Sequence, residues 1–275
     1  MPFATNLQKM TRSSSGLRTA KGLLMSAYEA VLAVWWREFI VYTREKERAV
    51  SSVVTPLIWL LAFGAGLGAS ISVAGLNYQE FIFPGILAMN VLFTSMFYGM
   101  YVVWDKKLDV LKEILIAPQP RWVAFMGKCL GGLSICAVQA SILMLAGWLF
   151  MGIPVTPSNY LFTLAGALLF GIGSSSLGLF IGAKLNSPDS FSLVMSFVMW
   201  PLFLTSGALY PMSHLPDYLQ VLVHVNPMAY GVDLMRGALL GAWTFGPMLD
   251  VGVLLLFGAL FFWLGKEAFE RISLG

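Results

Sequence analysis

The chain has 275 residues, of which 58% are hydrophobic and only 11% are charged. Soluble domains carry about 25% charged residues, so this composition excludes an ordinary soluble globular protein and indicates an integral membrane protein. The formal net charge of +3 requires no nucleic-acid partner, because membrane proteins carry an excess of Lys and Arg in their cytoplasmic loops.

Several stretches of the chain are long and apolar enough to cross a bilayer, which takes about 20 predominantly apolar residues per helix. The candidate spans are residues 50–70, 81–104, 124–152, 160–183, 190–210 and 248–265. We therefore predict an all-α integral membrane protein with six transmembrane helices.

The distribution of basic residues predicts the orientation of these spans. All but one of the 17 Lys and Arg residues, Arg236, fall on segments that six spans would place on one side of the membrane. Basic segments stay in the cytoplasm, so we expect both termini there. Residues 1–49 then form a cytoplasmic N-terminal part and residues 50–275 the transmembrane domain. The first 22 residues lack the apolar core of a signal peptide, which agrees with this orientation.

An amphipathic helix is predicted between residues 23 and 49. Apolar and aromatic residues recur there at helical spacing, while Glu29, Arg37 and Arg44 occupy other positions on the helix. This pattern favours a helix lying in the membrane interface. A helix packed on the protein's own core is the alternative.

A compact charged stretch, "VVWDKKLDVLKEILIAPQPR", occupies residues 102–121. It predicts an amphipathic cytoplasmic helix at about residues 105–117, which Pro118 and Pro120 end. Such a helix could lie along the membrane, cover its own bundle, or insert into a groove of a soluble partner. Its apolar face consists of Trp104, Leu108, Leu111 and Leu115, and its acidic row of Asp105, Asp109 and Glu113.

The proline-rich outer segment, about residues 211–247, contains an apolar piece too short to cross a membrane. We predict one or two short re-entrant helices between spans five and six. Asn226 is placed to cap a helix that has Pro227 in its first turn. Asp233 and Arg236 lie three residues apart and are expected to pair.

Three pairs of glycines have the GxxxG spacing that lets helix backbones approach closely: Gly64 with Gly68, Gly127 with Gly131, and Gly178 with Gly182. These pairs favour packing within the chain. A subunit interface is the alternative.

The chain offers little for catalysis or ion coupling. It has no GxxxxGK[ST] motif and no G-x-S-x-G elbow, so we expect no ATP hydrolysis or other enzyme activity by this chain alone. His214 and His224 lack the further ligands of a zinc site, so we predict no bound metal or cofactor.

Ionisable residues are missing from the middle of the first five spans, which disfavours a proton-coupled carrier. Lys128 and Lys184 lie near cytoplasmic ends and Asp250 near an outer end, where each is expected to reach the interface. Cys129 and Cys136 are expected to be small buried residues, too far apart for a disulfide with each other.

Two longer motifs carry a resemblance to a known family. They are "FIFPGILAMNVLFTSMFYGMYVVWDKKLDVLKEILIAPQPRWVAFMGKCLGG" at residues 81–132 and "YPMSHLPDYLQVLVHVNPMAYGVDLMRGALLG" at residues 210–241. Because both motifs are present and occur in this order, the chain resembles the permease subunit of type-2 ATP-binding-cassette (ABC-2) exporters. The resemblance covers about residues 30–270 and is to the drug and nodulation-factor branch in particular. "APQPR" departs from the more usual AP followed by a small residue, Ser and Arg.

The resemblance implies that residues 105–117 are a coupling helix that docks on a separate nucleotide-binding subunit. That P-loop subunit would be present in two copies and would bind ATP and Mg. The second half of the transporter would be another copy of this permease, or a related chain. The contact residues implied are Leu108, Leu111, Lys112, Glu113, Leu115, Pro118 and Arg121.

The resemblance also implies an outer motif and a substrate path. The motif would either gate the outer exit or only stabilise a surface helix. The path would run between spans one, two and five. The aromatic side chains there could equally be ordinary packing residues. The motif consists of Asn226, Pro227, Tyr230, Asp233 and Arg236. The path residues are Trp59, Phe93, Phe97 and Phe203.

The function expected from the sequence is that of a permease subunit of an ATP-driven exporter in a prokaryotic cytoplasmic membrane. Its substrate would be amphipathic: a drug-like compound, glycolipid, lipo-oligosaccharide or polysaccharide. A membrane anchor of a cytosolic ATPase complex and a secondary carrier are the alternatives.

Overall fold

The computed structural model describes residues 27–68, 72–73, 75–111, 119–212 and 215–272. The helices in chain order are α2 (Ala27–Arg44), α3 (Lys46–Gly68), α4 (Tyr78–Phe97), α5 (Gly99–Lys107), α7 (Trp122–Met151), α8 (Pro157–Lys184), α9 (Pro188–Leu204), α10 (Asp217–Val225), α11 (Pro227–Leu240) and α12 (Pro247–Glu270). A short antiparallel hairpin, β1 (Ser72–Val73) and β2 (Leu76–Asn77), precedes α4.

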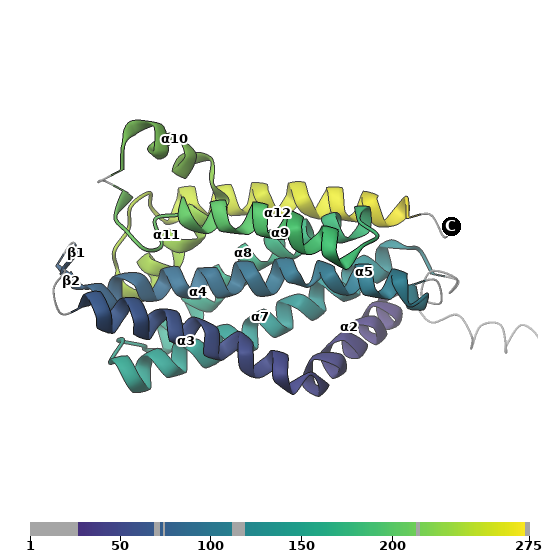
Figure 1. Cartoon of the computed structure of the whole chain (residues 1–275), viewed down its shortest axis with the longest axis horizontal. Coiled ribbons are helices and arrows are strands. Elements are labelled where there is room, and N and C mark those ends of the chain that lie inside the picture. The colour runs from purple at the N-terminus through teal and green to yellow at the C-terminus, as the bar shows by residue number, and fades with distance from the viewer. Residues whose placement is uncertain (1–26, 69–71, 74, 112–118, 213–214, 273–275) are drawn as a thin grey trace, which may run out of the picture.

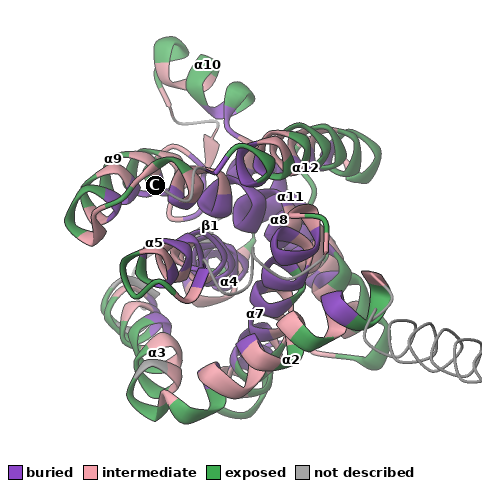
Figure 2. Ribbon diagram, turned by 90° about the vertical axis from the view of Figure 1, so that its right-hand side faces the viewer, coloured by how far each residue is buried: buried purple, intermediate pink, exposed green. Residues whose placement is uncertain are grey.

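The long helices lie side by side along one axis and form a bundle (Figure 1). The hairpin, α10 and α11 lie at one end, and the C-terminus lies at the other. Buried residues concentrate on α4, α8 and α11, while exposed residues cover the outward faces of α3, α9, α10 and α12 (Figure 2). A bundle with an apolar outer surface is what a lipid environment requires.

Each predicted span coincides with a helix, but the helices differ in how well they suit a bilayer. Among the described residues, four helical segments are long and apolar enough to cross a membrane: Tyr78–Lys107, Trp122–Met151, Pro157–Lys184 and Pro247–Glu270. The helix α9 has only 17 residues. Residues 49–64 of α3 qualify only together with α2, at a bend of 68°. The count of six spans therefore stays a prediction.

Glycines allow a close helix crossing between α8 and the α4–α5 segment. A Cβ at Gly178 would overlap the backbone of Met96 and one at Gly182 the backbone of Gly99. Gly131 lies against α2, where an added Cβ would lie 2.7 Å from Glu38 Cβ. These two GxxxG pairs thus pack within the chain, as the first interpretation predicted.

The N-terminal helix α2 packs chiefly on α7. Val31 and Tyr42 are buried, whereas Tyr28 and Trp36 are 71% and 54% exposed. One face therefore joins the protein's own core, as the alternative interpretation expected. The membrane-interface location of the other face remains a prediction.

The outer segment contains two helices of different character. The helix α11 is almost entirely buried against α4, α8 and α12. In contrast, α10 projects from the bundle (Figure 2) and exposes Tyr218, Val221 and Val225. The short helices were predicted, but the hairpin before α4 was not, because four paired residues leave little trace in a sequence.

Candidate functional site

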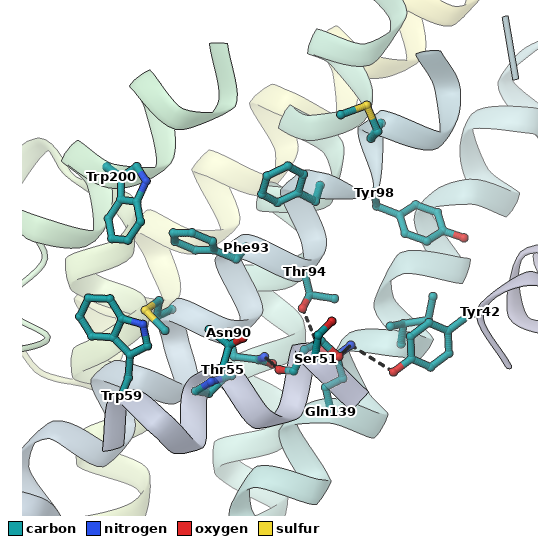
Figure 3. A pocket seen from close by; sticks show the side chains of 16 residues that line it. Tyr42, Ser51, Thr55, Trp59, Asn90, Phe93, Thr94, Tyr98, Gln139 and Trp200 are labelled. Carbon is teal, nitrogen blue, oxygen red and sulfur yellow. Dashed lines mark hydrogen bonds between the residues drawn. The ribbon is translucent and has the colours of Figure 1, made fainter. Parts of the chain in front are cut away.

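A cavity of about 450 Å³ opens between α3 and the helices beside it (Figure 3). Helices α2, α3, α4, α5, α7 and α9 contribute to it, so it joins segments from very different parts of the chain. Sixteen side chains line it, and none of them is acidic or basic. They are Tyr42, Ser51, Ser52, Thr55, Pro56, Trp59, Met89, Asn90, Phe93, Thr94, Phe97, Tyr98, Met100, Ile135, Gln139 and Trp200.

One wall of the cavity is aromatic. The ring of Trp200 on α9 lies 5.4 Å from that of Phe93 and 6.2 Å from that of Trp59, centre to centre. Phe97 also lines the cavity. Phe203 does not: it is fully buried and packs edge-on against Trp59 at 5.9 Å. Three of the four predicted aromatics therefore meet at the cavity, and the fourth supports its wall.

The opposite side is a hydrogen-bonded polar cluster centred on Gln139, which is only 1% exposed. Its Nε2 donates to Tyr42 Oη at 3.1 Å and to Ser52 Oγ at 2.8 Å. Its Oε1 accepts from Thr94 Oγ1 at 2.6 Å. One amide thus joins α2, α3, α4 and α7. Sequence analysis missed this cluster, because isolated polar residues in apolar helices do not indicate their partners.

Asn90 differs from Gln139 in having an unused group. Its Nδ2 donates to the backbone oxygen of Ser52 at 2.8 Å. A carbonyl oxygen only accepts hydrogen bonds, so the atom facing Ser52 must be the amide nitrogen. The remaining Oδ1 is covered by its surroundings and has no hydrogen-bond partner among the described residues. Asn90, which lines the cavity, therefore carries an unpaired acceptor.

A buried cluster of charges lies beyond the cavity, toward the end of the bundle that carries the C-terminus. Lys128 Nζ contacts Glu38 Oε1 at 2.8 Å and Asp105 Oδ2 at 2.5 Å. Arg37 contacts the same two carboxylates, at 2.9 Å and 3.1 Å. Two cations and two anions balance, as burial of charges requires. The charge cluster, Arg37, Glu38, Asp105 and Lys128, connects α2, α5 and α7.

The charge cluster corrects the prediction for Lys128. Its side chain is fully buried instead of extending to the interface, because α2 covers the start of α7 and supplies Glu38. Tyr98 links this cluster to the cavity, since it lines the cavity and donates to Glu38 Oε2 at 2.7 Å. The signal in the sequence was the presence of Arg37, Glu38 and Lys128 inside otherwise apolar stretches. Their pairing across helices could not be deduced.

The structure modifies the predicted coupling helix. The helix α5 ends at Lys107 and Asp109 has a φ of 60°, so no continuous helix begins at residue 105. Asp105 belongs to the charge cluster and not to an exposed acidic row. Leu108 is 65% exposed, whereas Leu111 is 1% exposed and packs in the bundle. Lys112, Glu113, Leu115 and Pro118 lie outside the described residues.

Arg121, predicted to contact the partner, forms bonds within the chain. Its Nη1 donates to the backbone oxygens of Glu270 at 3.1 Å and Ile272 at 2.6 Å. These bonds fix the end of α12 beside the segment that follows the predicted coupling helix.

The outer motif folds as a capped helix. Asn226 Oδ1 accepts from Met228 N at 2.9 Å, and Pro227 occupies the first turn of α11. Asn226 Nδ2 also donates to the backbone oxygen of Leu202, at 2.6 Å. Tyr230 donates to the backbone oxygen of His224 at 2.8 Å. The cap was predicted from the Asn-Pro pair alone, because both interactions are local.

Asp233 and Arg236 interact electrostatically, but their hydrogen bonds are made to other groups. Asp233 accepts hydrogen bonds from the backbone N–H groups of Thr244 and Phe245, each at 2.8 Å. Arg236 donates to the backbone oxygen of Gly207 and lies 4.2 Å from the centre of the Phe81 ring. These partners lie in loops that pack against α11, and the spacing of residues along a helix does not predict such contacts.

Three other expectations from the sequence concern Asp250, the two cysteines and metal binding. Asp250 is fully buried near Asp233 and therefore does not reach the interface as predicted. Cys129 and Cys136 are buried free thiols. Within the described part of the chain, no group of three or more His, Cys, Asp or Glu residues could hold a metal ion.

The chain is similar in sequence to known bacterial proteins. The inner membrane transport permease YadH of Escherichia coli K12 is 29% identical over 250 residues, covering 88% of this chain and 95% of YadH. Nodulation protein J of Rhizobium leguminosarum bv. viciae is 27% identical over 242 residues, covering 82% of this chain and 88% of its own. Nodulation protein J of Sinorhizobium fredii is 27% identical over 256 residues, which cover 87% of this chain and 92% of that protein. The sequence profile of the ABC-2 type transporter family matches residues 29–240, and this chain belongs to that family.

Proposed function

We propose that this chain is the transmembrane permease subunit of an ATP-driven exporter for an amphipathic substrate. It would act in a prokaryotic inner membrane as a six-span subunit with both termini in the cytoplasm. The family implies an ATP-binding partner subunit in general. We propose two such subunits with two copies of this permease, or with this chain and a related half.

The cavity is the observation that carries this proposal. Its volume of about 450 Å³ falls within the range of about 300–1,000 Å³ of small-molecule sites. It is formed by helices of the bundle itself, and it combines an aromatic wall with a polar side, as an amphipathic molecule requires.

The charge cluster supports a route for force between the partner and the bundle. Asp105 is near the end of α5, directly before the segment that we propose to dock on the ATPase. Its ion pairs join that helix end to α2 and α7. A movement of the docking segment would therefore move three helices together, in the manner of rigid-element transitions.

Leu108 gives the sharpest test of partner docking, because it is an exposed apolar residue at the start of the proposed docking segment. We expect Leu108→Asp to remove a copurifying P-loop ATPase, while the permease itself stays folded. Tyr28→Asp is the matched control, since Tyr28 is an exposed aromatic residue outside that segment. The measurement is affinity purification of the tagged chain in mild detergent, with ATPase activity and partner stoichiometry.

The outcomes separate the alternatives. An ATPase that Leu108→Asp removes, together with loss of substrate export, supports the exporter. An ATPase that is released with no transport defect in any substrate screen favours the membrane anchor. A folded chain that purifies alone and without ATPase activity would reject the exporter and favour a carrier.

A further inference from the structure

We propose that the cavity binds an uncharged amphipathic molecule whose polar group donates a hydrogen bond to Asn90 Oδ1. This inference rests on the proposed function, because it names the class of substrate for the same site. It has three supports: the lining side chains, the state of Asn90, and the aromatic wall.

The lining excludes a charged ligand group. None of the sixteen lining side chains is acidic or basic. Tyr98 links the lining to a charge, but its hydroxyl is bonded to Glu38, and Glu38 is paired with Lys128 and Arg37. An ion transferred into this cavity would lose its water without gaining a counter-charge, which is strongly unfavourable. Neutral polar groups carry a much smaller desolvation cost.

Asn90 supplies the recognition group. The residue is 4% exposed, its Nδ2 is bonded to Ser52, and its Oδ1 has no partner in the described part of the chain. Buried acceptors are rarely left unpaired in native structures. Oδ1 is itself covered, so binding requires the Asn90 amide to turn toward the cavity. A ligand hydroxyl or amide N–H would then satisfy this oxygen, whereas an ether or a tertiary amide would not.

The other buried amide in the lining cannot serve in the same way. Gln139 uses its nitrogen for Tyr42 and Ser52 and its oxygen for Thr94. Its role is to hold four helices together. The structure thus separates a closed amide from an open one within the same cavity.

The aromatic wall would take the apolar part of the ligand. Trp59, Phe93 and Trp200 present ring surfaces from three helices. Met89 and Met100 lie in the same lining, and flexible thioether side chains adapt to ligands of different shape. The choice of ligand would therefore depend on the polar group of the ligand more than on the shape of its apolar part.

The test is a competition assay on the permease in nanodiscs, together with whatever ATPase copurifies. Tritiated dodecanamide is displaced by unlabelled dodecanamide, N,N-dimethyldodecanamide, dodecanoate and dodecyltrimethylammonium, with empty nanodiscs to correct for partitioning into lipid. We expect dodecanamide to compete about fivefold better than its dimethyl derivative, as one neutral hydrogen bond allows. The two ions should compete least.

Asn90→Leu should reduce the preference for dodecanamide to below about twofold, since the acceptor is removed. Ser95→Ala is the matched control: Ser95 is also a buried polar residue on α4, but it does not line the cavity, so the preference should stay. Asn90→Ala provides a second variant if Leu does not fold. Equal competition by both amides, a preference that survives both Asn90 variants, stronger competition by either ion, or no displaceable binding would overturn the inference.

The same preparation distinguishes this inference from the proposed function. An active copurifying ATPase with no Asn90-dependent preference rejects the recognition role and leaves the exporter intact. An Asn90-dependent preference in a chain that never associates with an ATPase rejects the exporter and leaves the binding site intact.

Discussion

The charge cluster and the cavity are both polar regions inside an apolar bundle, but they differ in how their polar groups are used. In the cluster, two cations and two carboxylates satisfy one another across α2, α5 and α7. In the cavity, all lining side chains are neutral, and Asn90 Oδ1 has no partner among the residues that the structure describes. A closed network fixes helices relative to one another, whereas an unpaired acceptor on a residue that lines a cavity can still bond to a ligand. The contrast separates a structural role from a binding role.

The largest effect is expected from Lys128→Met. Removing this fully buried cation leaves two carboxylates with the partly exposed Arg37 as the one cation of the cluster, and breaking a buried ion pair costs about 3–5 kcal/mol. We expect a large loss of folded protein, measured by thermal unfolding in detergent. Lys266→Met, at an exposed ion pair, should change stability by about 0.5 kcal/mol or less.

A double variant sharpens this prediction. Adding Glu38→Gln to Lys128→Met removes one carboxylate together with one cation, so Arg37 can still balance Asp105. The double variant should be more stable than Lys128→Met alone. If it is less stable, charge balance is not what holds the cluster together.

Tyr98→Phe should have the next largest effect, because it removes the hydrogen bond between the cavity edge and the carboxylate of Glu38. Hydrogen bonds to charged groups contribute about 1.5 kcal/mol or more. The free energy of unfolding should fall by about that amount, as measured by reversible unfolding in mixed micelles.

Tyr42→Phe is the neutral counterpart, and its expected effect is smaller than that of Tyr98→Phe. Its hydroxyl accepts from Gln139 at 3.1 Å, and polar contacts between membrane helices average about 0.6 kcal/mol. Equal losses for Tyr42→Phe and Tyr98→Phe in the same assay would show that the two regions do not differ as proposed.

The positions of the apolar helices and the cap of α11 were predictable, because both depend on neighbours in the sequence. Apolar runs fix where a helix can cross a membrane, and Asn226 with Pro227 marks a helix start without reference to the rest of the chain. The aromatic residues Trp59 and Phe93 were also identified, since a family resemblance indicated which spans meet.

Only the tertiary structure decided which polar groups are paired. Lys128 meets Glu38 across 90 positions of sequence, and Gln139 meets Tyr42 across 97. Asp233 bonds to a returning loop and not to Arg236, three residues away. Hydropathy and helical spacing describe one segment at a time, whereas a buried polar group takes whichever partner the packing of several helices brings within about 3 Å. For that reason the sequence alone determined the helices, and the packing determined the charge cluster, the cavity and the unpaired acceptor of Asn90.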